Sequence, residues 1–250
     1  MRLRHRGMWN AARSGGVTGI SLNLASLNSR VFAYYKMDEA SGDRADSGSG
    51  ALTLTDNNTV TQAAGAKIGN AAQFTKANLE FLSSASASFA RGDTDWSYVT
   101  WLYADTLPGA AENHSVLSKD NAVNDRGYFL TLNGDAGPAY QFLVYDGAST
   151  QIGGVTDPQV IGDGAWHMLA CGHRASSNDV WISTDAAAKT VAATTGAAGD
   201  SATDLQIGAL VSILSWSGRM DETAFFNTDV SATELAYLYN SGDGRTYPFT

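Results

Sequence analysis

The sequence predicts an all-β protein: a sandwich of two antiparallel sheets, with one short helix near its C-terminal end and an arm at its N-terminal end. Three observations lead to this expectation. Short runs with strand-like apolar alternation recur from residue 31 onward. The turns between them are rich in glycine, with 26 glycines against 4 prolines. Only one segment carries a full set of helix start and stop signals.

Residues 1–30 are predicted to form a basic arm, and residues 31–250 a single domain. The arm contains five arginines and no acidic residue, so the rest of the chain holds 11 basic against 25 acidic residues. An acidic body is a poor partner for nucleic acid. The arm is expected either to bind an acidic partner or to be a solvated tail. Its candidate docking residues are Arg2, Arg4, Arg6 and Arg13, with Ile20, Leu22 and Leu24 alternating as a possible strand.

Strand patterns follow one another from residue 31 to residue 227. Asn-Gly and Asp-Gly pairs, which are strong signals for tight turns, bound two of these patterns. No internal repeat or linker divides the region, and no stretch approaches the roughly 20 apolar residues of a membrane span. The ranges expected to form strands are 31–37, 70–75, 79–83, 96–105, 127–135, 139–147, 165–174, 179–185, 204–210 and 217–227.

The range 165–174 is expected to be a central strand that packs on both faces. Trp166 and Met168 lie on one face by strand parity, and Leu169 and Cys171 on the other. Cys171 is the only cysteine, so no disulfide forms within the chain. Its parity places it in a buried position, where a thiol behaves as a small apolar group.

The single helix is predicted to begin after Ser231. Ser231 is a good N-cap, and Glu234 three residues later completes a capping box. Val230 and Leu235 stand at the two positions of a hydrophobic staple. Because so short a helix needs a surface to dock on, we expect it at the edge of the sandwich. The apolar stripe and the stop signal are Leu235, Leu238, Tyr239 and Gly242.

Several segments resemble, in order, those of the laminin-G-like, concanavalin A-like lectin/glucanase domains. These are "YYKMDEASGDRADSGSGALTL", "GAKIGNAAQFT", "DWSYVTWLYA", "DGAWHMLACGHRASSNDVWISTD", and "LQIGA" with "WSGRMDETAFFNTDVSATELAYLYNSG". The resemblance covers about residues 31–245 and implies a two-sheet jelly roll. After Ile182 the chain departs from the family, which often has an Asp-Gly turn where this sequence reads "STDAAAKTV".

Some members of this superfamily are glucanases, and retaining hydrolysis needs two facing carboxyl groups at about 5 Å. No expected strand carries carboxylates at alternate positions. Asp221 and Glu222 are adjacent, so on a regular strand they would point to opposite faces. The sequence therefore predicts a protein that is not an enzyme.

The resemblance also implies a structural calcium ion between the opening loop and the late Asp strand. The matching residues are Asp46 and Asp221, with Asp38 and Asp43 in reserve. Carboxylate and carbonyl oxygens are the ligands that calcium prefers. The alternative is that Asp46 caps a turn and Asp221 pairs with a nearby base.

Glycan binding would need exposed aromatic rings and polar groups in a concave site. Strand parity places Trp101, Trp166 and Trp181 in the core. The tryptophans expected to be exposed, and therefore the candidate ligand-binding residues, are Trp9, Trp96 and Trp216.

The function expected first is a non-catalytic structural or adhesive protein of a virus particle, such as a phage capsid-decoration subunit or fibre component. Laminin-G-like domains occur in such proteins, and a basic arm would anchor an acidic body to other virion proteins. Assembly into a homo-oligomer is expected for that role. The alternatives are a carbohydrate-binding lectin, secreted or at a cell surface, and, with less support, a glycoside hydrolase.

Overall fold

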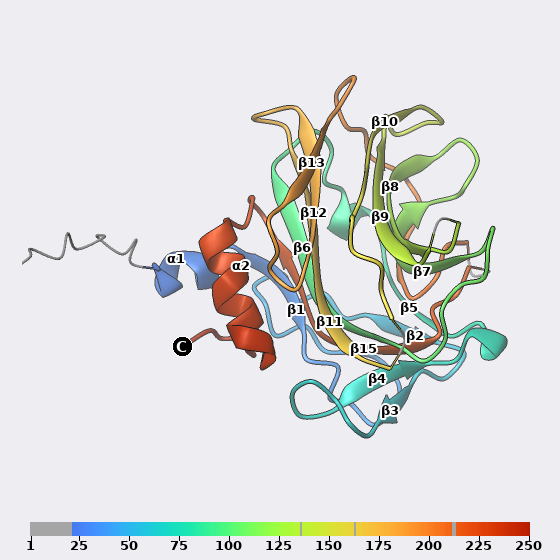
Figure 1. The fold of residues 1–250 in the computed structure, drawn as a ribbon, viewed down its shortest axis with the longest axis vertical. Helices are drawn as coiled ribbons and strands as arrows, with labels where there is room; N and C mark the ends of the chain where they lie inside the picture. The colour runs from blue at the N-terminus through green and yellow to red at the C-terminus, as the bar shows by residue number, and fades with distance from the viewer. Residues whose placement is uncertain (1–21, 136, 163, 212–213) are drawn as a thin grey trace, which may run out of the picture.

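Two antiparallel sheets face each other in the computed structural model, which describes residues 22–135, 137–162, 164–211 and 214–250 (Figure 1). Sheet I runs in the order β13 (Thr190–Ala193), β12 (Asp179–Thr184), β11 (Trp166–Arg174), β6 (Trp96–Ala104), β15 (Gly218–Phe226), β4 (Ala71–Phe74) and β3 (Thr61–Ala63), and β1 (Val31–Tyr35) also pairs with β15. Sheet II runs in the order β10 (Gln151–Thr156), β9 (Ala139–Tyr145), β8 (Arg126–Asn133), β7 (Asn113–Asp120), β14 (Leu205–Ile207), β5 (Phe81–Ser84) and β2 (Thr55–Asn57).

This arrangement confirms the predicted fold class. Each predicted strand range overlaps one of these strands, whereas β2, β3, β7, β10 and β13 lie outside those ranges. Short 3-10 turns span Lys76–Asn78 (η1), Ser86–Phe89 (η2) and Asn240–Gly242 (η3).

The inter-sheet core lies between the inner faces of the two sheets. Leu169 and Cys171 of β11 point into it, while Met168 and Ala170 point away, into a second apolar cluster. The expectation of a strand packed on both faces is therefore confirmed. Alternation along β11 is what allows a single strand to serve two apolar layers.

The second apolar cluster, called here the outer cluster, covers part of the outer face of sheet I. Helix α2 (Ala232–Tyr239) contributes Leu235 and Leu238 to it. The capping box is present, because the hydroxyl of Ser231 accepts a hydrogen bond from the Glu234 amide, and the Glu234 carboxylate accepts one from the Ser231 amide. The helix lies on the sheet face and not at the edge that the sequence predicted (Figure 1).

The helix also ends earlier than predicted. Its C-cap is Asn240, with φ of +50°, two residues before the expected stop at Gly242. Asparagine enters the left-handed region more readily than most residues because its short polar side chain can hydrogen-bond locally. Here the Asn240 side-chain amide donates to the carbonyl of Gly244.

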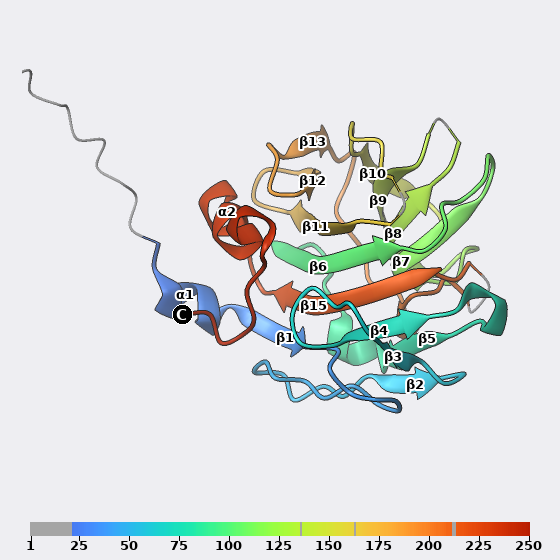
Figure 2. The ribbon, with the colours of Figure 1, turned by 60° about the horizontal axis from the view of Figure 1, so that its bottom comes forward.

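Part of the predicted arm packs on the body. Leu24 begins helix α1 (Leu24–Ser29), so the strand predicted through Leu24 is wrong; the side chain of Asn23 caps this helix by accepting from the Ser26 amide. Leu27 is fully buried in the outer cluster. Asn28 donates to the carbonyl of Phe249 and accepts from its amide. Helix α1 therefore lies beside the C-terminal residues (Figure 2).

Among the other predicted arm residues, the structure describes Leu22, which is partly exposed and lies outside any strand. No helix in the described ranges is both long and apolar enough to pass through a bilayer. The predicted residues that lie outside the described part of the chain are Arg2, Arg4, Arg6, Trp9, Arg13 and Ile20.

Candidate functional site

The tryptophans expected to be exposed are buried. Trp96 is 2% exposed and packs against Tyr128 and Phe142 in the inter-sheet core. Trp216 is fully buried, with its ring edge-on to His114. The prediction fails because Trp96 opens β6 on the side that faces inward, and because the loop carrying Trp216 folds back over the core. Neither ring is accessible to a sugar.

Among the tryptophans that the structure describes, the one that remains partly exposed was assigned to the core by the sequence. Trp166 begins β11 and lies on the outer face of sheet I. It packs at the margin of the outer cluster, as does Tyr239, the last residue of α2, which stacks on Trp101. Trp101 itself is 2% exposed, as predicted for a core residue.

A single transverse row of outward-facing side chains crosses five strands of sheet I at the end where Trp166 lies. Strand register places Trp166 opposite Tyr103 of β6, and Tyr103 opposite Arg219 of β15. Arg219 is in turn opposite Gln73 of β4, which is opposite Thr61 of β3. We call these five residues the aromatic–polar row. Their chain neighbours Leu102, Met220 and Ala72 point into the inter-sheet core.

Four of the five members of the row form a chain of side-chain contacts, and all five are at least partly exposed. The rings of Tyr103 and Trp166 lie 5.6 Å apart, tilted by 60°. The guanidinium carbon of Arg219 lies 4.4 Å from the Tyr103 ring centre. Gln73 donates to the carboxylate of Asp105 at 2.8 Å, and Arg219 reaches the same carboxylate at 3.8 Å. The charge of the guanidinium is thus offset by a neighbouring carboxylate.

The loop 64–70 orients Trp166. The indole N–H of Trp166 donates to the carbonyl of Gly65 at 3.0 Å. Two carboxylates hold the loop. The buried Asp221 accepts from the amides of Lys67 and Ile68, each at 2.9 Å. Asp38 accepts from the amide of Asn70 at 2.7 Å. Burial raises the pKa of Asp221 to about 7, with the charge of Asp38 adding to the rise.

The four residues predicted as calcium ligands are Asp38, Asp43, Asp46 and Asp221, and the calcium site stays a prediction. Each of these carboxylates accepts at least one backbone amide hydrogen bond. In the described part of the chain, no three His, Cys, Asp or Glu side chains form a group able to hold a metal. Asp46 accepts from the amides of Tyr34, Gly48 and Leu52, and Asp43 accepts from the amide of Asp56.

The adjacent carboxyl groups Asp221 and Glu222 do not form a catalytic pair, although their predicted orientation is wrong. A bulge interrupts the pairing of β15 with β6 between Asp221 and Ala224, and Glu222 has φ of +47°. The bulge turns both side chains toward the outer face, where a regular strand would separate them. Glu222 accepts from the Tyr34 hydroxyl and is 4% exposed, and Asp221 is fully buried. Substrate has no access to either group.

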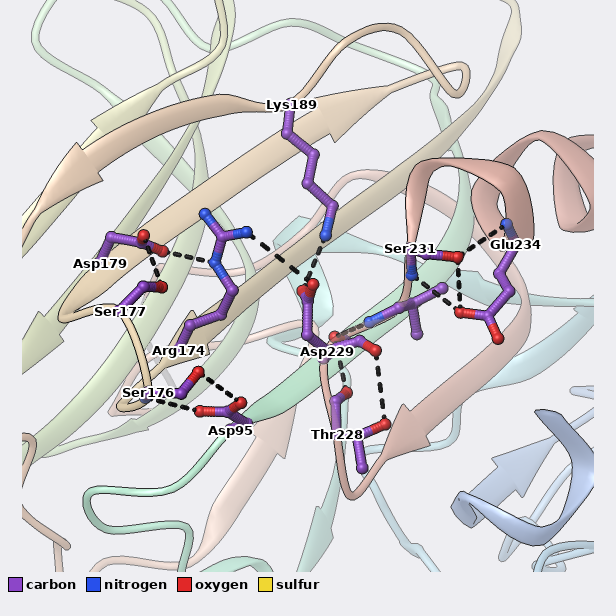
Figure 3. Close-up of polar contacts among 12 residues, drawn as sticks. Asp95, Arg174, Ser176, Ser177, Asp179, Lys189, Thr228, Asp229, Ser231 and Glu234 are labelled. Atoms are coloured by element: carbon purple, nitrogen blue, oxygen red, sulfur yellow. Dashed lines mark hydrogen bonds and ion pairs between the residues drawn. The ribbon is translucent and has the colours of Figure 1, made fainter. Parts of the chain in front are cut away.

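A network of ion pairs fixes α2 at the other end of β11 (Figure 3). Arg174 and Lys189 converge on Asp229, in the turn that leads into α2, at 3.9 and 2.7 Å. Arg174 also binds Asp179 at 2.6 Å. Because Arg174 ends β11 and Trp166 begins it, the two ends lie about 26 Å apart. The network holds the helix start far from the row.

The residues that sequence reasoning missed are Tyr103, Arg219, Gln73 and Thr61. Each lies on the outward side of its strand, and that alternation is readable from the sequence. Their alignment into one row depends on the pairing of β11, β6, β15, β4 and β3, which are far apart in the chain. That register is the part that the sequence does not reveal.

Comparison with known proteins gives one family match. A model described as the concanavalin A-like lectin/glucanases superfamily matches residues 75–236. No curated protein matches the chain.

Solved structures with a similar fold include domain 4 of AbnA, a GH43 extracellular arabinanase from Geobacillus stearothermophilus, in complex with arabinotriose. Its TM-score is 0.62 at 15% identity, over 83% of this chain and 97% of that one. The binding domain of Paraclostridial Mosquitocidal Protein 1 has a TM-score of 0.67 at 12% identity, over 86% and 53%. The ligand-binding domain of botulinum neurotoxin serotype D in complex with N-acetylneuraminic acid has 0.68 at 8%, over 88% and 52%. The chain spans about half of each toxin domain, and these likenesses establish the fold.

Proposed function

The chain belongs to the concanavalin A-like lectin/glucanases superfamily, and from this membership and the aromatic–polar row we propose that it is a non-catalytic saccharide-binding protein. The observation that carries the proposal is the partly exposed Trp166–Tyr103 pair beside the planar polar groups of Arg219, Gln73 and Asp105. Aromatic faces present an apolar surface to the C–H side of a sugar ring. Amide, guanidinium and carboxylate groups hydrogen-bond its hydroxyls with defined geometry.

The charge balance of the row favours an uncharged saccharide. The charged groups of Arg219 and Asp105 lie 3.8 Å apart, and their opposite charges balance. An acidic sugar therefore finds no unpaired cation in the row, and an amino sugar finds no unpaired carboxylate. Two of the similar folds were solved with saccharides, arabinotriose in one and N-acetylneuraminic acid in the other. The first of these is uncharged and is the natural starting probe.

The test is a glycan array with the purified chain, followed by calorimetry of Trp166→Ala and Arg219→Gln on the glycans that bind. Both variants should weaken binding at least about tenfold. Phe81→Ala, which removes a partly exposed ring from β5 of sheet II, is the matched control and should bind as the parent does. Absence of binding to every glycan, or unchanged binding by Trp166→Ala with its melting temperature intact, would reject the proposal.

A second candidate function is display on a virus particle. Helix α1 and the C-terminal residues lie together on the outer side of sheet I, and sheet II lies on the other side of the sandwich (Figures 1 and 2). We propose that residues 1–21 anchor the chain to other virion proteins, in a symmetric oligomer, so that sheet II faces outward. Mass spectrometry of purified particles tests the location. A truncation after residue 21 keeps α1 and its contacts, and normal incorporation of that variant would rule out the anchor.

A further inference from the structure

Sheet II has a depression of its own at the end formed by β8, β9 and β10. It has a volume of about 370 Å³. Register places Thr156 of β10 opposite Gln141 of β9, and Asn133 of β8 opposite Ala139 of β9. Because Tyr140, Phe142 and Leu132 point into the inter-sheet core, these four side chains point outward. The loops after β8 and β10 form the walls, with Asp135, Gly137, Asp157, Pro158 and Val160.

The polar groups of the depression are held in place by the chain around them. Asp157 is 4% exposed and accepts from the Gln159 amide and the Thr184 hydroxyl, at 2.8 and 3.0 Å. Asn133 accepts from the Asp135 amide at 2.8 Å, which leaves its side-chain NH₂ as a donor. The floor is therefore preorganised, and a ligand would lose little by ordering it.

These groups select an uncharged ligand rich in hydroxyls. Two carboxylates and no cationic side chain line the depression, so an anion is repelled. Each oxygen of Asp157 already accepts a hydrogen bond, and Asp135 is exposed to water. The hydrogen-bonding groups left for a ligand are therefore the uncharged amides and hydroxyl of the floor. Val160, which is 70% exposed, and Pro158 offer an apolar wall to the C–H face of a sugar ring. The volume lies at the lower end of the range for small-molecule sites.

We propose that this depression is a second saccharide-binding site, distinct from the aromatic–polar row, so that one chain can bridge two saccharide strands. The inference rests on the proposed saccharide-binding function and extends it. The two sites lie on the outer faces of opposite sheets, with the inter-sheet core between them. Asp157 lines the depression, and Trp166, which belongs to the row, begins β11.

The experiment is an amide-resolved NMR titration of the full chain with arabinotriose, cellotriose, xylotriose and maltotriose in turn. For at least one trisaccharide, two separate groups of amides should shift: one around Trp166 and Tyr103, and one around Gln141 and Thr156. Val160→Arg places a long charged side chain in the depression. The affinity measured from the second group of shifts should fall at least about tenfold in this variant. The affinity measured from the first group should stay unchanged.

Val123→Arg is the matched control, because Val123 is 69% exposed and lies in the loop after β7, outside the depression. It should leave both groups of shifts as they are in the parent. Shifts confined to the Trp166 group would overturn the second site and leave the proposed function standing. Shifts confined to the Gln141 group would support the depression and remove the row from the proposed function. No shift with any of the four sugars would overturn both.

Discussion

Replacement of Glu222 by glutamine should make the protein more stable at alkaline pH and leave its stability at pH 4.5 nearly unchanged. Glu222 is 4% exposed beneath the C-terminal residues, where the Tyr34 hydroxyl donates to it. The nearby guanidinium of Arg245 binds the Tyr237 carbonyl and the Asn240 side chain instead. The charged form therefore lacks a counter-ion, and burial raises the pKa of Glu222 to about 8.

The sign and size of the effect follow from proton linkage. Between the ordinary pKa of 4.5 and the native value of about 8, the folded chain holds a proton on Glu222 that the unfolded chain has released. The free energy of unfolding therefore falls as pH rises through this window, by about 1.4 kcal/mol per pH unit. The full effect is on the order of 2–5 kcal/mol above pH 8. Glutamine does not titrate, yet its carbonyl still accepts from Tyr34.

Urea unfolding, followed by tryptophan fluorescence at intervals from pH 4.5 to pH 9.5, measures this difference. Asp221 titrates in an overlapping range in both proteins, so its contribution cancels in the comparison. Tyr34→Phe serves as a second variant: it removes the donor to the charged carboxylate, so the fall in stability should continue to a higher pH than in the parent. Parallel curves for the parent and Glu222→Gln would show that Glu222 ionises normally and that the argument from burial is wrong.

Three further predictions concern the surrounding framework. Ser231→Ala removes the N-cap of α2 and should lower the free energy of unfolding by about 1 kcal/mol; an unchanged urea midpoint would contradict the capping argument. Asn28→Ala removes both hydrogen bonds to Phe249 and should cost about 1–3 kcal/mol, with faster amide exchange at Phe249; unaltered exchange would mean that α1 does not hold the C-terminal residues. Because the Asp46 and Asp221 carboxylates already accept backbone amides, calcium and a chelator should both leave the melting temperature unchanged, and a rise of several degrees with calcium would restore the metal site.

The features that the sequence predicted well depend on local signals. The capping box of α2 needs only Ser231 and Glu234, which are three residues apart. The two-faced packing of β11 follows from alternation over nine residues. Strands β7 and β10 were not predicted because their sequences, "NHSVLSKD" and "QIGGVT", contain serine, charged residues and glycine, which have little preference for strands. Pairing of β7 with β8 and of β10 with β9 holds them as strands instead.

The predictions that failed needed knowledge of distant chain segments. Asp221 and Glu222 turn to the same side because of a bulge against β6, more than a hundred residues earlier. Trp96 and Trp166 exchanged their expected environments for a similar reason. Strand parity says that two residues share a face, but only the packing of α2 and sheet II decides whether that face is covered.

The position of the aromatic–polar row follows from how the outer face of sheet I is covered. A large sheet whose outer face is apolar must bury it, and α1, α2 and the C-terminal residues do so over the outer cluster. Tyr239 stacks on Trp101, and Trp166 packs at the margin of the outer cluster. Beyond that point the outward residues have to tolerate water while they remain close-packed. Tyr103, Trp166 and the stem of Arg219 meet that condition because each has an apolar body and a polar tip. Ring faces beside hydrogen-bonding groups are also what a saccharide requires, so the boundary of the helical cover is where a sandwich of this kind can acquire a binding surface without opening its core.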